Sequence, residues 1–166
     1  MSYPAGILPE FDEEMAKTRT VIERVPEEKF GWQAHAKSRN LGWNANHLAE
    51  IPGWVEGTIK DTEWDFSPLG GPAYQTPSLT SRAEILAMFD TNVATARKAI
   101  EGAADTDMTV PWTLKYQGEV LFTMPRADVI RKFVLNHIIH HRAITCVYLR
   151  LNDVPVPGMY GPSGDD

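Results

Sequence analysis

Proline and glycine gather in a few parts of this chain, and their distribution constrains the fold more than any other feature of the sequence. The 166 residues include 12 prolines and 12 glycines, which leave four long segments largely uninterrupted. In these segments apolar residues recur at three- and four-residue steps, and this spacing predicts amphipathic α-helices. The predicted helices cover residues 9–25 and 41–60, the segment between Ser81 and Gly102, and residues 125–151.

Two of the predicted helices carry further local signals. Pro52 lacks an amide hydrogen and clashes with the preceding turn, so we expect the second helix to kink or restart between Leu48 and Pro52. The third helix starts with Ser81 and Glu84 in the spacing of a capping box. Gly102 is expected directly after its last turn, where glycine commonly ends a helix.

The remaining segments predict loops and one hairpin. Apolar and polar residues alternate from Thr109 to Met124 around Gln117-Gly118, which predicts a short β-hairpin that lies on the helices. Prolines and glycines cluster in residues 61–79, so we expect a long surface connection that covers another part of the molecule. Residues 26–40 are expected to form a loop, and residues 152–166 a tail on the surface.

Length and composition indicate one domain, residues 1–166, with enough apolar residues (43%) for a core. The 16 basic and 22 acidic residues leave a formal net charge of −6, which argues against a nucleic-acid partner. A single cysteine, Cys146, is typical of a reducing compartment. The first residues lack the pattern of a signal peptide, and histidines interrupt the most apolar segment. We therefore expect a cytoplasmic protein without a membrane span.

Three histidines are candidate metal ligands. His137 and His141 are one helical turn apart on an otherwise apolar face, so both imidazoles can reach one ion. Hydrogen-bonded histidines in the core or on the surface would show the same spacing. His47 lies within the second predicted helix and could supply a third ligand. Three imidazoles would leave a coordination position open, as in catalytic sites, and they suit zinc, nickel, copper or iron.

Other polar residues are assigned less specific roles. His140 points to the side of the face of His137, so it is a poorer ligand and is expected either on the surface or supporting a metal ligand. Glu50, three residues after His47, could orient the His47 ring, but a solvent-facing glutamate is the preferred interpretation. His35 is expected in solvent and Cys146 in the core. The five tryptophans are expected to fill the core and the helix junctions, although some could line a pocket.

Several motifs lie near the two ends of the chain, in Arg24–Trp32, Leu41-Gly42, His47–Ala49, His137–Arg142, Tyr148–Asn152, Val154-Pro155 and Tyr160–Ser163. Together they resemble the DinB-like (DinB/YfiT) family of metal-dependent enzymes. The resemblance implies an all-α fold, a four-helix bundle whose helix order differs from simple up-and-down, that commonly forms homodimers. It also implies a divalent metal held by three histidines, which match His47, His137 and His141 here.

The resemblance also suggests a function. Characterised relatives include thiol-dependent S-transferases and isomerases that use bacillithiol, mycothiol or glutathione. We therefore expect a metal-dependent transferase, with zinc or nickel as cofactor, that activates a low-molecular-weight thiol for attack on a small electrophile. One alternative is a hydrolase that uses metal-bound hydroxide, and another is a metal-binding stress-response protein without turnover. The sequence identifies no catalytic proton donor or acceptor.

Overall fold

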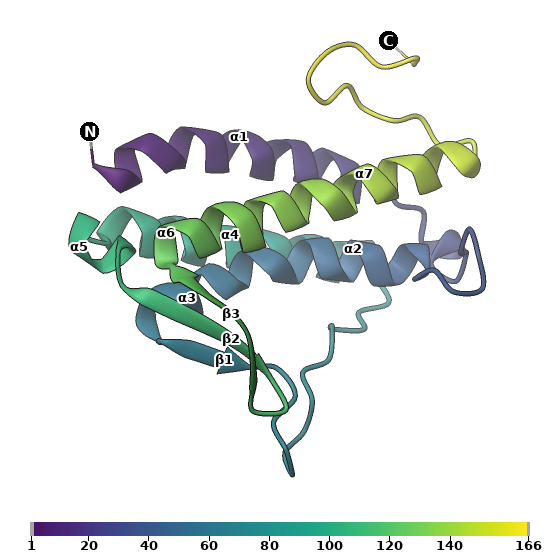
Figure 1. The fold of residues 1–166 in the computed structure, drawn as a ribbon. Coiled ribbons are helices and arrows are strands. Elements are labelled where there is room, and N and C mark those ends of the chain that lie inside the picture. Colours follow the sequence, from purple (N-terminus) through teal and green to yellow (C-terminus); the bar gives the residue numbers. More distant parts are fainter. Residues whose placement is uncertain (1, 166) are drawn as a thin grey trace.

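The computed structural model describes residues 2–165, so Met1 and Asp166, the two ends of the predicted domain, lie outside the described residues. The protein is mostly helical and carries a small three-stranded sheet (Figure 1). The long helices are α1 (Tyr3–Ile22), α2 (Leu41–Glu50), α4 (Arg82–Gly102) and α7 (Asn136–Leu151). The shorter elements are η1 (Glu27–Lys29), η2 (Ile51–Gly53), α3 (Trp54–Lys60), β1 (Glu63–Asp65), α5 (Asp105–Met108), β2 (Pro111–Tyr116), β3 (Glu119–Pro125), α6 (Arg126–Asp128) and the π-helical η3 (Val129–Leu135).

The long helices enclose one apolar core. Helix α1 contacts α4 and α7, and α2 contacts the same two helices. Each helix contributes side chains that are at most 1% exposed, namely Phe11, Leu48, Phe89 and Ile138. Burying one such side chain contributes roughly 1.5–3 kcal/mol, so the apolar faces hold the helices together. Within residues 2–165, no helix combines the length and hydropathy needed to cross a membrane.

The first helix starts earlier than its sequence predicted. It begins at Tyr3 rather than Pro9, because the Ser2 hydroxyl accepts a hydrogen bond from the amide of Ala5 and caps the first turn. Pro9 therefore lies inside the helix, where it lacks an amide hydrogen for the bond to Ala5. Burial of Ile7, two residues before the predicted start at Pro9, stabilises this added segment against the core.

The second and third predicted helices form largely as expected. The second is interrupted at Pro52, where the 3₁₀ turn η2 separates α2 from α3. The side chain of Asn40 caps α2 by accepting a hydrogen bond from the Trp43 amide at 2.7 Å. Ser81 caps α4 through the Glu84 amide at 3.3 Å. The expected position of Gly102 was wrong, because it is the last helical residue and Ala103 follows as the cap in extended conformation.

The predicted hairpin is confirmed, but the all-α fold class was too narrow. Strands β2 and β3 are antiparallel, and Gln117 (φ 53°) and Gly118 (φ 80°) both adopt the left-handed conformation that a tight hairpin turn requires. Strand β1 adds to β2 in parallel, so the sheet order is β1-β2-β3. Residues 63–65 were predicted as loop because three residues are too few for an alternating pattern to show.

A π-helical segment shifts the buried face of the last helical region. The chain leaves β3 at Pro125 and runs through α6 and η3 into α7. The predicted inward stripe contained His137 and His141, but both are half-buried, and Ile138 and Arg142 occupy the core instead. A π turn inserts one extra residue into the helix, which rotates the following side chains. The two histidines consequently lie at the edge of the core.

A buried ion pair joins α1, α7 and the C-terminal tail. Arg142 and Glu14 are only 2% and 5% exposed, and the Arg142 Nη2 donates to Glu14 Oε2 at 2.5 Å. The Arg142 Nη1 donates to the Glu14 carbonyl at 3.0 Å. Tyr160, in the tail, donates from its hydroxyl to Glu14 Oε1 at 3.0 Å and accepts from Arg142 at 2.7 Å. The surface tail is thus tied to two core helices.

We expect Arg142→Met to lower the free energy of unfolding by about 3 kcal/mol or more, because the buried Glu14 carboxylate would lose its counter-charge. Arg97→Met is the matched control, since Arg97 pairs with Asp12 where both side chains are more than two-fifths exposed. The control should lose less than about 1 kcal/mol. Urea denaturation of both variants measures the difference, and equal losses would contradict a stabilising role for the buried pair.

Candidate metal centre

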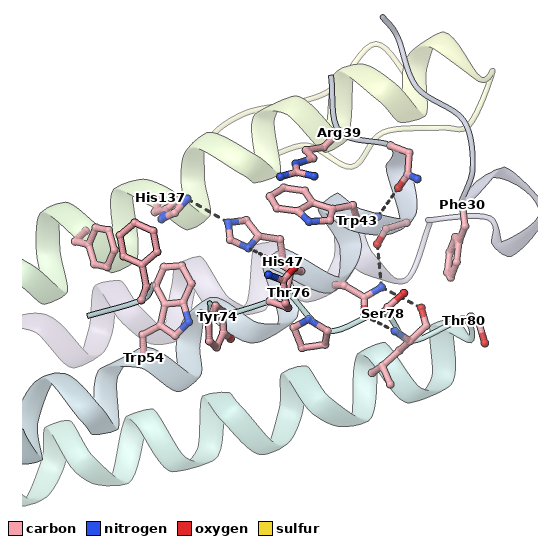
Figure 2. Close-up of a pocket in the computed structure, with 18 of the residues that line it drawn as sticks. Phe30, Arg39, Trp43, His47, Trp54, Tyr74, Thr76, Ser78, Thr80 and His137 are labelled. Carbon is pink, nitrogen blue, oxygen red and sulfur yellow. Dashed lines mark hydrogen bonds between the residues drawn. The ribbon is translucent and has the colours of Figure 1, made fainter. Parts of the chain in front are cut away.

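A cavity of about 780 Å³ lies beside α2 and the start of α7. Its walls are largely aromatic, and residues 74–80 of the long connection form one side (Figure 2). The covering role expected for residues 61–79 agrees with this arrangement. The tryptophans divide between two roles, because Trp43, Trp54 and Trp64 line the cavity while Trp112 is buried beneath the sheet. The sequence left open that some tryptophans line a pocket, and these three do so.

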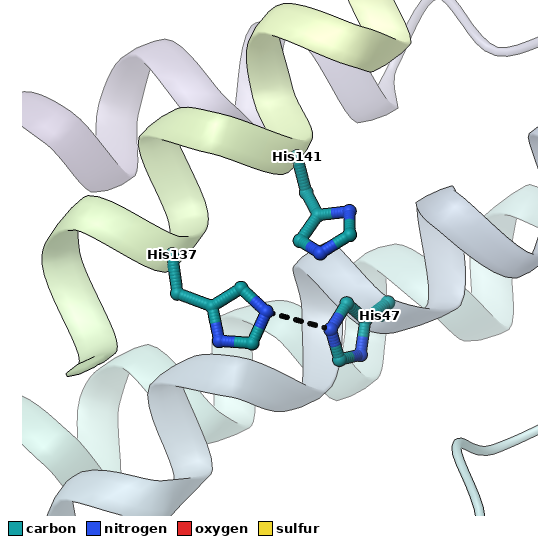
Figure 3. Close-up of side chains that lie close together, drawn as sticks. All are labelled: His47, His137 and His141. Atoms are coloured by element: carbon teal, nitrogen blue, oxygen red, sulfur yellow. Dashed lines mark hydrogen bonds between the residues drawn. The ribbon is translucent and has the colours of Figure 1, made fainter.

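The three candidate histidines meet at this cavity (Figure 3). His47 projects from α2, and His137 and His141 project from α7, which packs against it. Each offers one ring nitrogen, and these three atoms lie within 4.8 Å of one another. The Nε2 atoms of His47 and His137 are 3.2 Å apart. His47 and His137 also line the cavity, so the cluster is open to a small molecule.

Two neighbouring side chains of α2 orient the imidazoles. Nδ1 of His47 contacts Oε1 of Glu50, and Nδ1 of His141 lies 3.2 Å from Oδ1 of Asn44. Both oxygens are acceptors, which places the Nδ1 proton on each ring and leaves its Nε2 lone pair free. Glu50 is only 4% exposed, so the preferred interpretation of a solvent-facing glutamate was wrong. The spacing of three residues between His47 and Glu50 was the available signal.

The electrostatic environment keeps the α7 histidines neutral. Burial, together with the charges of the neighbouring His47 and His140, lowers the pKa of His137 to about 4. Burial likewise lowers the pKa of His141 to about 3, with contributions from His47 and His137. At neutral pH both rings are therefore unprotonated, which is the state in which an imidazole nitrogen can coordinate a metal.

The long connection reaches the histidine cluster through Tyr74. Its hydroxyl donates to Oε2 of Glu50 at 2.5 Å, while the other carboxylate oxygen faces His47. Burial and the hydrogen bond to Glu50 raise the pKa of Tyr74 to about 12, so the phenol keeps its proton at neutral pH. Thr76 adds a hydroxyl 3.5 Å from Nδ1 of His47. Sequence reasoning missed both residues, because no local pattern links them to α2.

The remaining candidates lie outside the cluster. His140 is exposed, and its ring lies edge-on to His141 with centroids 5.0 Å apart, in agreement with its expected surface position. His35 is also exposed. Cys146 is half-buried against the core, and burial raises the pKa of its thiol, which disfavours the reactive thiolate.

The donor set fits a divalent transition metal. Three imidazoles, two of them with hydrogen-bonded Nδ1 atoms, are a ligand arrangement suited to zinc, nickel, copper or iron. Three protein ligands leave at least one coordination position for water or substrate, which is typical of catalytic rather than structural sites. The residues His47, His137 and His141 could therefore hold a metal and present it to the cavity.

Comparisons with known proteins agree with this architecture. A DinB-like protein from Bacillus cereus ATCC 10987 has a similar structure, with a TM-score of 0.72, 22% identity, and coverage of 94% of this chain and 97% of that one. A DinB-like protein from Bacillus subtilis, YjoA, has a TM-score of 0.70 and 14% identity, with coverage of 95% and 99%. At these identities the likeness concerns the fold. The search of curated proteins gave no match.

The sequence itself carries the family signature. Residues 10–144 match the sequence model of the DinB superfamily. This range spans most of the chain and includes all three clustered histidines. The family expected from the sequence motifs is thus confirmed, and the chain belongs to the DinB superfamily.

Proposed function

We propose that this protein is a divalent-metal-dependent transferase that joins a low-molecular-weight thiol to a small electrophile. The observation that carries the proposal is the three-histidine cluster open to an apolar cavity. Its volume, about 780 Å³, lies within the range of pockets that hold small molecules. The proposal also includes thiol use, a four-helix bundle and a homodimer, because the family resemblance supports them.

In this proposal His47, His137 and His141 hold the metal. When bound, the ion supplies Lewis acidity that lowers the pKa of a coordinated thiol or water. The thiol sulfur forms a bond to the electrophilic carbon, the leaving group departs with its electron pair, and the thiol proton passes to solvent. Glu50 and Asn44 hold two imidazole rings in position, and the aromatic walls exclude water from the reacting groups.

The first prediction concerns metal content. Protein purified without a metal-binding tag is expected to contain about one zinc or nickel ion per chain, and His137→Ala should lose it. His140→Ala is the matched control, because His140 is adjacent in space but outside the cluster, and should retain the ion. Elemental analysis measures all three proteins. Wild-type protein that neither contains nor takes up a divalent ion would refute the proposal.

The second prediction concerns the orientation of His47. Glu50→Gln is expected to weaken metal affinity about 10- to 100-fold while all three imidazoles remain, because the carboxylate acceptor of the His47 Nδ1 proton is lost. Glu56→Gln serves as control, since Glu56 pairs with Lys60 on α3, away from the cluster. Competition with a chromophoric chelator measures both affinities. Equal metal affinities of the two variants would show that Glu50 does not orient His47 for metal binding.

The third prediction concerns turnover. Metal-loaded protein is expected to form a thioether from monochlorobimane with bacillithiol, mycothiol or glutathione at least tenfold faster than His141→Ala does. The fluorescent product and mass spectrometry report the reaction. A product in which water replaces the leaving group, formed without thiol, would instead indicate the hydrolase. Metal binding without any turnover across a panel of electrophiles would favour a non-catalytic metal-binding protein.

A further inference from the structure

The two ends of the cavity differ in chemistry, and this difference indicates what kind of ligand would fit. Most of its wall is aromatic or aliphatic, and among its described lining residues Arg39 is the one permanent charge and none is acidic. At one end Trp54 lies against Phe133 and Trp64, with ring centroids 5.4 and 5.7 Å apart. At the other end Arg39 reaches the rim. An apolar body and one negative charge would match these two ends.

Arg39 is held at the cavity without a counter-ion. Its guanidinium lies over the Trp43 ring, 4.9 Å from the centroid. Within residues 2–165 it forms no ion pair, so its donors are free to meet an incoming anion. A guanidinium presents a planar set of N–H donors that suits a carboxylate, and stacking on an indole reduces the entropy lost on binding.

The histidine cluster lies between the two ends. The Trp43 ring stacks on His47 with centroids 4.4 Å apart, and Figure 2 shows Trp43 between Arg39 and His47. On the other side the His47 ring contacts Trp54 with centroids 5.7 Å apart. The order along the cavity is therefore Arg39, Trp43, His47 and Trp54. A ligand that spans both ends places its middle atoms beside the imidazoles.

One wall of the cavity is preformed. The side chain of Asn46 in α2 accepts from the Leu79 amide at 2.9 Å and donates to the Leu79 carbonyl at 3.0 Å. These paired bonds fasten residues 76–80 to α2, while Tyr74 is bonded to Glu50. A wall held at both positions needs little reorganisation when a ligand enters.

We propose that the cavity binds an aromatic small molecule carrying one carboxylate, with the carboxylate on Arg39 and the aromatic group against Trp54. This ligand assignment deepens the proposed function. It rests on that function for one point, namely that the bound molecule is the electrophile. It places the reactive carbon between the two anchored ends, next to the histidines. Binding itself requires only the cavity and Arg39.

The test is isothermal titration calorimetry with three probes. These are 3-(2-naphthyl)propionate, its uncharged primary amide, and propionate, which has the charge but no ring. Each is titrated into wild type, Arg39→Gln and Lys37→Gln, in chelator-treated and zinc-loaded forms. Lys37 is the matched control because it is an exposed cation of the same loop that does not line the cavity.

We expect the naphthyl carboxylate to bind wild type about tenfold more tightly than the amide, as for a hydrogen bond to a charged group at a partly exposed site. Arg39→Gln should abolish this preference without changing amide affinity, and Lys37→Gln should preserve it. Propionate should bind at least tenfold more weakly than the naphthyl carboxylate. If the preference for the carboxylate over the amide survives Arg39→Gln, or appears only with zinc, the anion binds elsewhere and the proposal is overturned. Propionate that binds as tightly as the naphthyl carboxylate would also overturn it.

Metal content separates this inference from the proposed function. Arg39 contacts Trp43 rather than a histidine, so Arg39→Gln should hold as much metal as wild type. If wild type binds no metal yet shows an Arg39-dependent preference for the carboxylate, the transferase proposal fails and the ligand assignment stands. If metal binds and the preference is absent, the ligand assignment fails alone.

Discussion

The packing of α2 against α7 is the contact on which the candidate site depends. It brings His47 to His137 and His141 at the edge of the apolar core, where His47 is buried and the two α7 histidines are half-buried. Burial removes water from the ring nitrogens, and this loss keeps the α7 rings neutral but leaves their hydrogen-bonding needs unmet. Asn44 of α2 supplies a hydrogen bond to His141, Glu50 of α2 does the same for His47, and both contacts aim the free ring nitrogens at a common point.

The long connection between β1 and α4 links the cluster to the cavity. Tyr74 bonds to the carboxylate that orients His47, and Leu79 is fastened to α2 through Asn46. One segment thus completes the wall of the cavity and supports the position of an imidazole. The small sheet closes the aromatic end, because Trp64 of β1 lies against Trp54. The cavity is consequently built from parts that differ in secondary structure but share an aromatic lining.

Local sequence patterns predicted most of the helical structure and the three clustered histidines. Ser81 caps the third helix, Pro52 interrupts the second, and Gln117-Gly118 turns the hairpin, because each acts through neighbours a few residues away. Strand β1 was missed because its partner lies about 50 residues further along the chain. Glu50 was misjudged because burial of a carboxylate depends on what packs around it, and the π turn was missed because its register shift leaves the apolar pattern intact.

The sequence by itself determined that the second helix breaks at Pro52, that the third begins after Ser81, and that His137 and His141 share a helix face. These outcomes depend on spacing and turn chemistry within a few residues. Only the tertiary structure decided that His47 joins them across 90 residues. It also decided that Arg142, rather than His137 or His141, occupies the core, and that Arg39 stands beside an aromatic cavity without an ion pair among residues 2–165. Such outcomes depend on which helix faces pack against one another and are buried from water. That is a property of the packed helices rather than of any one segment.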